Sequence, residues 1–298
     1  MRPLLVIGHG TTSEEGVAEF GRLVDEVRGA VDVPVEGGFL ELAPPPIQDA
    51  VNRLVAQGHT VLDVVPLVLV AAGHSKGDIP AALERERLRH PGLTFRYARP
   101  LGPHPLLLED LADRLAAVAE PATWPDTAVV LVGRGATDPD ANSEVAKVAR
   151  LLLEGRGLGT VETSFVSLAE PGVPAALDRA DRLGFKRVVV LPYFLFPGVL
   201  PDRVVAQSQA WAADHPDHEV RCADVIGPTD RLVRLVLERA AELETGDIRM
   251  SCDTCAYRVL MPGFEDKLGR PQTPHDHPDD PTHSHDHGHD LGHGHHHH

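Results

Sequence analysis

The sequence predicts an α/β protein built from two similar βα domains, each with a parallel sheet covered by helices on both faces. Two observations support this. Apolar, strand-like runs alternate with helical patterns along the chain, and the order of the first half recurs in the second at an offset of roughly 125 to 129 residues. A chain of 298 residues is long enough for two ordinary domains. Two such halves can face each other across a cleft, which is a common place for a ligand site.

The first half contains four short strand-like runs, and a pattern of helical period follows each of them. The expected strands cover residues 3–8, 33–40, 60–70 and 93–98, and the expected helices cover 14–31, 47–57, 79–90 and 105–118.

A proline-containing stretch over residues 120–125 separates the halves, and the same order then starts again. The second set of strands is expected over residues 127–132, 159–167, 187–196 and 219–225. We therefore expect a first domain over residues 1–121, a second over 126–246, and a C-terminal segment over 247–298 without the βα pattern.

Corresponding motifs in the two halves differ at chemically reactive positions. The first half has His9-Gly10-Thr11 where the second has Arg134-Gly135-Ala136, and Glu41 has Glu170 as its apparent counterpart. The loop with His74 corresponds to residues 196–200, which contain no histidine. We infer that the first half carries the chemistry and that the degenerate second half completes the pocket.

His9, His74 and Glu41 are the candidate site residues, because each follows an expected strand of the first half. Loops after parallel strands open at one edge of the sheet, where ligands bind. Two imidazoles and a carboxylate can hold a divalent transition metal, and an imidazole can also transfer a proton. The alternatives are that each histidine caps a helix or bonds a loop carbonyl, and that Glu41 is a helix cap or a solvated side chain.

Several of these motifs together resemble the class II tetrapyrrole chelatases, and more closely the sirohydrochlorin chelatases of cobalamin and sirohaem synthesis. The most specific of them is Gly-His-Ser-Lys-Gly-Asp-Ile-Pro over residues 73–80, and the others are Gly8-His9-Gly10-Thr11, Phe39-Leu40-Glu41 and Pro100-Leu101-Gly102. The resemblance covers roughly residues 3 to 243. It implies two chelatase-like domains, with His9 and His74 handling the metal and Glu41 assisting.

The implied reaction is insertion of a divalent metal into sirohydrochlorin, with Co²⁺ as the leading candidate and Fe²⁺ or Ni²⁺ as alternatives. One His/Glu site accepts several divalent ions, so the sequence does not select among them. The substrate carries many carboxylates, whereas the chain has a formal net charge of −16. Lys76 and Arg134, at equivalent sheet edges, are therefore the expected substrate-binding cations, and solvated surface charge is the alternative for both.

The C-terminal segment contains two further candidate metal sites. Cys252 and Cys255 form a Met-x-Cys-x-x-Cys motif, which the resemblance associates with an iron–sulfur cluster. Two thiols cannot complete such a cluster, so further ligands would be needed, for example from the second chain of a homodimer. The alternative is that the two thiols have no function. From His275 onward the chain is rich in His, Asp and Gly, and we expect a disordered metal-holding tail. Its candidate ligands include His283, His285, His287, His289, His293 and His295.

Composition limits the remaining function classes. The acidic net charge argues against a nucleic-acid-binding surface, and no apolar run is long enough to cross a bilayer. Three cysteines and the lack of a signal-peptide pattern favour the reducing cytoplasm. A metal-storage or delivery protein is the alternative from another class, but it would leave the motif over residues 73–80 unexplained.

Overall fold

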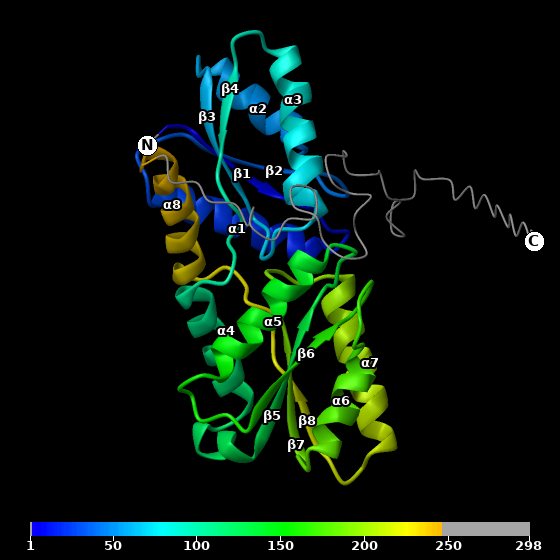
Figure 1. The fold of residues 1–298 in the computed structure, drawn as a ribbon. Coiled ribbons are helices and arrows are strands. Elements are labelled where there is room, and N and C mark those ends of the chain that lie inside the picture. Colours follow the sequence, from blue (N-terminus) through cyan, green and yellow to red (C-terminus); the bar gives the residue numbers. More distant parts are fainter. Residues whose placement is uncertain (1, 246–298) are drawn as a thin grey trace, which may run out of the picture.

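Two four-stranded parallel sheets lie at the centre of the computed structural model, which describes residues 2–245 (Figure 1). The first sheet has the order β2-β1-β3-β4 and the second β6-β5-β7-β8, so the two halves share one topology. The strands are β1 Leu4–Gly8, β2 Val35–Phe39, β3 Val61–Pro66, β4 Thr94–Tyr97, β5 Thr127–Gly133, β6 Thr160–Phe165, β7 Arg187–Pro192 and β8 Glu219–Cys222. The predicted fold class is confirmed.

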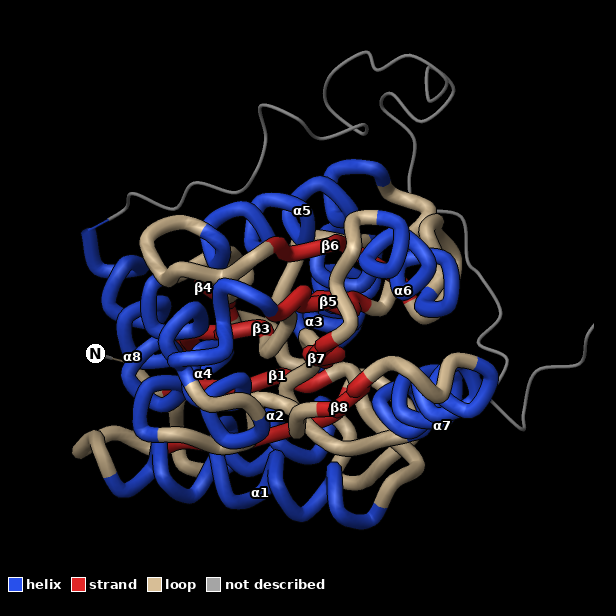
Figure 2. The backbone as a smooth tube through the Cα atoms, turned by 90° about the horizontal axis from the view of Figure 1, so that it is seen from below, coloured by secondary structure: helices blue, strands red, loops and turns tan. Residues whose placement is uncertain are grey.

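Helices lie on both sides of the strands (Figure 2). The helices are α1 Glu14–Gly29, α2 Ile47–Ala56, η1 His74–Asp78, α3 Ile79–Arg89, α4 Pro105–Val118, η2 Pro121–Asp126, α5 Pro139–Leu153, α6 Val173–Arg182, α7 Val199–Asp214 and α8 Asp230–Thr245. The central strands β1 and β5 are buried along their whole length, which explains their unbroken apolar sequences.

The two halves exchange their last helices. Helix α4 belongs to the first half of the sequence but packs against β7 and α5, whereas α8 from the second half packs against β3 and α1. In Figure 1, α8 accordingly lies beside the upper sheet and α4 beside the lower one. We call the first sheet with α1, α2, α3 and α8 the first domain, and the second sheet with α4 to α7 the second domain. The ranges 1–121 and 126–246 expected from the repeat follow the chain and do not describe this exchange.

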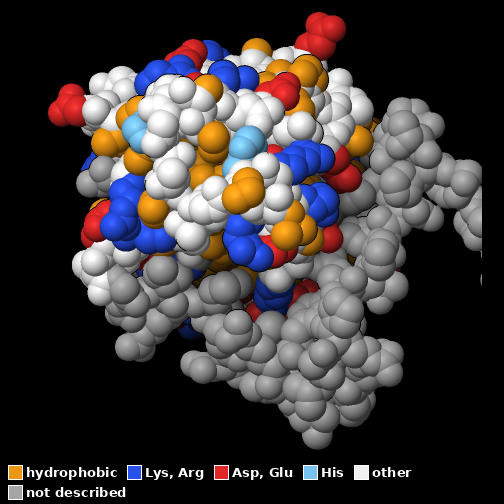
Figure 3. Space-filling model, turned by 90° about the horizontal axis from the view of Figure 1, so that it is seen from above, with side chains coloured by type: hydrophobic (Ala, Val, Ile, Leu, Met, Phe, Trp, Pro, Cys, Tyr) orange, Lys and Arg blue, Asp and Glu red, His pale blue; other side chains and the backbone are white. Residues whose placement is uncertain are grey.

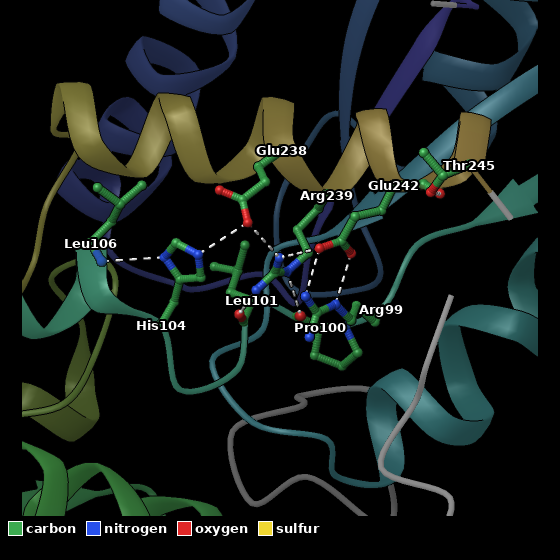
Figure 4. A network of polar contacts seen from close by, with 9 residues as sticks. All are labelled: Arg99, Pro100, Leu101, His104, Leu106, Glu238, Arg239, Glu242 and Thr245. Carbon is green, nitrogen blue, oxygen red and sulfur yellow. Dashed lines mark hydrogen bonds and ion pairs between the residues drawn. The ribbon is translucent and has the colours of Figure 1, made fainter. Parts of the chain in front are cut away.

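Arginine side chains fasten the two crossover segments that result. Arg239 of α8 is 1% exposed and donates to the carbonyl oxygens of Pro100 (3.1 Å) and Leu101 (2.7 Å). Arg99 in the same segment forms a two-pronged ion pair with Glu242 (Figure 4). In the other crossover, Arg114 of α4 donates to the carbonyl oxygen of Ile226 at 2.6 Å. These bonds satisfy carbonyls outside regular structure, and they tie each exchanged helix to the linker that leads into the other exchanged helix.

The strands β3 and β7 are shorter than the sequence suggested. Strands were expected over 60–70 and 187–196, but regular pairing ends at Pro66 and Pro192. The apolar residues that follow, at positions 67–70 and 193–196, line a cavity between the domains. Their hydrophobicity therefore reflects the cavity wall rather than the sheet.

The surface seen from above mixes Lys and Arg with Asp and Glu and scattered hydrophobic side chains (Figure 3). Such mixing is ordinary for a protein surface. In the part of the chain that the structure describes, no helix is both long and apolar enough to span a bilayer.

Candidate active site

The candidate residues of the first half lie at the topological switch point of its sheet. The chain leaves β1 towards β2 on one side, and β3 joins β1 on the other, so the loops after β1 and β3 diverge from adjacent strand ends. His9 directly follows β1, and the loop after β3 leads to His74 at the start of η1. Crevices at such switch points are the usual ligand sites of open α/β sheets.

His9 and Glu41 form the centre of the site. The Nε2 atom of His9 lies 3.1 Å from Oε1 of Glu41, and each side chain is 26% exposed. Glu41 reaches this place because the β1–β2 pairing continues past the strands: its amide donates to the carbonyl oxygen of His9 at 3.0 Å. The predicted juxtaposition of these two side chains is therefore present in the structure.

Gly10 lets the two loops approach closely. Its φ is +116°, and a Cβ atom built there would lie 1.8 Å from the carbonyl oxygen of Glu41. Leu42, next to Glu41, also has a positive φ of 66°. A left-handed leucine is uncommon, and such strain is often found at functional sites.

Arg134 faces this pair from the second domain. It follows β5 as His9 follows β1, and Gly135 repeats the close approach of Gly10 with 1.8 Å to the carbonyl oxygen of Ser167. Burial lowers the pKa of the Arg134 guanidinium, and the nearby carboxylate of Glu41 partly opposes that shift. Two residues from equivalent positions of the repeat thus meet at one site across the cleft, one an imidazole and the other a cation.

The backbone of η1 places the loop of His74 beside the site. η1 is a single π-helical turn, and isolated π turns occur frequently at functional sites. Ser75 is 1% exposed; its hydroxyl donates to the carbonyl oxygen of Ala72, and its own carbonyl accepts from the Tyr97 hydroxyl of β4 at 3.1 Å. Ala72 and Ser75 both line the cavity. The role of His74 as a metal ligand stays a prediction, because the description of this residue is limited to its backbone.

Lys76 has different partners from those expected. Its Nζ donates to Oδ2 of Asp138 at 2.8 Å and to Oδ2 of Asp140 at 2.9 Å, and its side chain is 8% exposed. Burial lowers the pKa of Lys76, but the hydrogen bonds to Asp138 and Asp140 outweigh it, so the pKa is raised overall. A lysine enclosed by two carboxylates is not available to a substrate carboxylate in this conformation, so the expected substrate-binding role does not fit its surroundings.

The predicted correspondence between Glu41 in the first half and Glu170 in the second half is wrong. The amide of Ser167 donates to the carbonyl oxygen of Arg134 just as that of Glu41 donates to His9, and left-handed Leu168 follows Ser167 as Leu42 follows Glu41. Ser167 is therefore the structural counterpart. Glu170 instead accepts from the amide of Gly172 at 2.8 Å in an exposed turn. The position equivalent to Glu41 in the second half is therefore occupied by a serine, so the carboxylate belongs to the first half of the repeat alone.

The site opens into a cavity of about 320 Å³ between the domains. Its walls are mostly apolar and include Phe20, Phe39, Tyr193 and Phe196, with His9 and Arg134 among the polar groups. Tyr193 is buried, and its hydroxyl has no hydrogen-bond partner among the described residues. An apolar cavity with a few convergent polar groups is the usual form of a small-molecule site.

The described side chains form no group of three or more His, Cys, Asp or Glu residues that could hold a metal, and that of His74 is not among them. The candidate cluster ligands Cys252 and Cys255 and the His-rich stretch from His275 lie outside the described residues 2–245.

Comparison with known proteins places both halves of the chain in one family. The sequence model of the CbiX family matches residues 3–118 and again residues 128–243. A sirohydrochlorin cobaltochelatase from Priestia megaterium is 39% identical over 262 residues, which is 87% of this chain and 85% of that protein. A sirohydrochlorin ferrochelatase from the same organism is 30% identical and is matched over 91% of its length.

Solved structures agree with these relatives. The structure described as SirB from Bacillus subtilis with Fe3+ superposes with a TM-score of 0.73 at 28% identity, covering 83% of this chain and 98% of that one. A SirB structure from Bacillus subtilis subspecies spizizenii in complex with cobalt gives a TM-score of 0.68 at 27% identity, with the same coverage of both chains.

Proposed function

This chain belongs to the CbiX family, and from that premise we propose that it is a sirohydrochlorin cobaltochelatase, which inserts Co²⁺ into sirohydrochlorin with release of two protons in cobalamin biosynthesis. The observation that carries the proposal is the His9–Glu41 pair, which lies on an apolar interdomain cavity beside the loop of His74. Insertion of iron, giving sirohaem, is the second candidate, because ferrochelatases are also among the relatives.

The hydrogen bonding of His9 explains how the pair can handle a cation. Its Nδ1 lies 3.2 Å from the carbonyl oxygen of Gly10, and because a carbonyl only accepts, we assign the proton of the neutral ring to Nδ1. In the neutral imidazole, Nε2 then directs a lone pair towards Glu41. Two acceptors at 3.1 Å repel each other unless a cation lies between them. That cation can be the substrate metal or a proton taken from a pyrrole N–H, and both are needed in chelation.

The distance is suitable for a metal. With a divalent ion about 2.1 Å from both Nε2 and Oε1, the angle Nε2–ion–Oε1 would be roughly 95°, which lies between the octahedral and the tetrahedral angle. We propose that His74 adds a third ligand from the adjacent loop. The remaining coordination positions would face the cavity, where the nitrogens of the macrocycle could replace water.

The apolar cavity and the guanidinium of Arg134 favour a large anionic substrate. About 320 Å³ is at the low end for drug-sized ligands, so a tetrapyrrole would fit only in part, or after the domains separate. We propose that the apolar walls contact the macrocycle and that Arg134 binds one of its carboxylates. The cytoplasm stays the proposed compartment, on the cysteine count alone.

Metal insertion can be measured directly with the purified full-length protein. We expect the free sirohydrochlorin absorbance to disappear with Co²⁺ faster than with Fe²⁺ or Ni²⁺ in anaerobic assays at equal metal concentration. Preference for Fe²⁺ would support the second candidate. If every metal reacts at the uncatalysed rate while the protein binds metal, the storage or delivery alternative is correct and the chelatase proposal fails.

Replacing Arg134 tests substrate binding separately from chemistry. We expect Arg134→Ala to raise the KM for sirohydrochlorin by roughly 10- to 100-fold, because one charge-assisted contact is lost, and to change kcat by less than about threefold. Arg85→Ala, at an exposed position of α3, is the control for charge and should change neither constant. A fall in kcat at unchanged KM would instead mean that Arg134 acts on the chemical step through Glu41.

The C-terminal metal sites remain proposals. The His-rich stretch could hold Co²⁺ near the cleft when the metal is scarce, because a tethered ligand acts at high local concentration. An iron–sulfur cluster on Cys252 and Cys255, and a homodimer to complete it, stay predictions from the sequence.

A further inference from the structure

Lys76, Asp138 and Asp140 connect the two domains at the loop that carries His74. Lys76 belongs to η1 in the first domain, whereas Asp138 and Asp140 lie at the start of α5 in the second. The side chains of Asp138 and Asp140 are 5% and 2% exposed. A second bond runs parallel to this triad, since the amide of Ala71 donates to Oε2 of Glu144 at 2.8 Å. The loop over residues 71–76 is therefore attached at both ends to one helix of the opposite domain.

The two carboxylate oxygens of Asp138 accept hydrogen bonds from different groups. Its Oδ1 caps α5 by accepting from the amide of Asp140 at 3.1 Å, and its Oδ2 accepts from Lys76. The carboxylate is thus held in orientation by its own helix before Lys76 reaches it. A preformed acceptor of this kind fixes the position of the lysine, and with it the backbone of η1, more narrowly than a freely rotating side chain would.

The equivalent contact between the loop after β7 and the opposite domain involves no ion pair among the described residues. There the loop at Pro197 and Gly198 packs against the start of α1, where a Cβ atom on Gly16 would lie 2.4 Å from the carbonyl oxygen of Pro197. Both halves thus place the loop after their third strand against the helix that follows the first strand of the opposite sheet, α5 in one case and α1 in the other. Among the described residues, only the loop leading through His74 makes this contact by a buried ion pair.

A buried ion pair suits a contact that must open. Separating the domains would return Lys76 and both aspartates to water, and the regained hydration offsets most of the lost attraction. The triad therefore adds little net barrier to opening, yet it fixes one geometry when closed. Tyr97 and the hydroxyl of Ser75 bond the same loop within the first domain, so the loop keeps local bonds when the cleft opens.

We propose that Lys76 is a positioning residue: with Asp138 and Asp140 it forms a latch between the domains, which sets the loop of His74 in its working position only when the cleft is closed. The catalytic part of this inference rests on the proposed chelatase function. The structural part, the dependence of the loop on the latch, does not.

The test uses the full-length protein with Asp138→Asn and Asp140→Asn combined. Asparagine caps helices as well as aspartate does, so α5 should persist while the charges are removed. We expect amide hydrogen exchange in peptides covering residues 68–80 to accelerate by about tenfold or more, with little change elsewhere in the first sheet. We also expect kcat for cobalt insertion to fall by roughly 10- to 100-fold at saturating metal and substrate, as a misplaced reacting group would cause.

A matched control exists in the same chain. Lys186 also lies between two aspartates, Asp181 at 3.0 Å and Asp217 at 2.8 Å, but this cluster is exposed and lies within the second domain. The pair Asp181→Asn and Asp217→Asn should change neither kcat nor exchange at 68–80. If the double variant at 138 and 140 does not fold, Lys76→Met combined with the same two substitutions removes all three charges and leaves no buried charge without a partner.

Unchanged exchange and kcat in a folded latch variant would overturn the proposal. So would faster exchange spread evenly over both domains, since that indicates general destabilisation. If the wild-type protein inserts no metal, the proposed function fails, but the exchange comparison still decides whether the latch holds the loop.

Discussion

Replacing His9 or His74 by alanine is expected to lower cobalt insertion by at least roughly 100-fold, because each change removes a group that can bind the ion or accept a proton. His9 is 26% exposed at the edge of a cavity, so its truncation should cost little folding stability. The losses should therefore appear at temperatures where both variants are folded, as judged by circular dichroism. The measurement is the initial rate of sirohydrochlorin disappearance at several Co²⁺ concentrations.

His90→Ala is the control for this pair. His90 ends α3 in the same domain and contacts Asn52 at 3.0 Å on an exposed surface away from the cavity. We expect wild-type rates for it. Near wild-type turnover in His9→Ala would remove His9 from the reaction, and a loss confined to His74→Ala would transfer the chemistry to the second loop.

The sequence was sufficient to predict the fold class and the meeting of His9 with Glu41. Both follow from general rules: alternating strands and helices give parallel sheets, and residues after neighbouring parallel strands share an edge. His9 and Glu41 needed no more than that. The duplication also led correctly to two sheets of equal topology.

Features that depend on contacts between distant segments were beyond sequence reasoning. Lys76 was expected to face the substrate because its position relative to the strand is right, but the carboxylates that surround it come from residues 62 and 64 positions away. The exchange of α4 and α8 is of the same kind, since the repeat pattern is identical whether each helix packs on its own sheet or on the other.

The error at Glu170 could have been avoided. His9 and Arg134 differ by 125 positions and Phe39 and Phe165 by 126, whereas Glu41 and Glu170 differ by 129. A constant offset points to Ser167. Glu170 was matched to Glu41 because both are glutamates, although the spacing favoured Ser167. The left-handed conformation of Leu42 and Leu168, which marks the equivalent positions, cannot be read from the sequence.

Gly10→Ala is expected to combine a large loss of stability with a nearly complete loss of activity. Alanine at a φ of +116° is strained, and its Cβ would meet the carbonyl oxygen of Glu41 at 1.8 Å, so one of the two loops must move. Together these effects should lower the free energy of unfolding by about 2–4 kcal/mol. Because the displaced carbonyl belongs to Glu41 itself, the His9–Glu41 pair should separate, and insertion should fall by roughly 100-fold even well below the melting temperature.

Two further glycines separate the contributions to this effect. Gly58 has a φ of +87°, and no atom lies within 4 Å of the position that a Cβ would take, so Gly58→Ala should show the backbone strain alone, about 1–2 kcal/mol, with normal activity. Gly135→Ala repeats both the positive φ and the 1.8 Å approach, but displaces Ser167 beside Arg134. It should be as destabilising as Gly10→Ala and should raise the KM for sirohydrochlorin while leaving most of kcat. Equal losses of kcat in Gly10→Ala and Gly135→Ala would mean that the two duplicated loops contribute equally to the chemistry. That result would contradict the proposal, which assigns the chemistry to His9 and Glu41 of the first half.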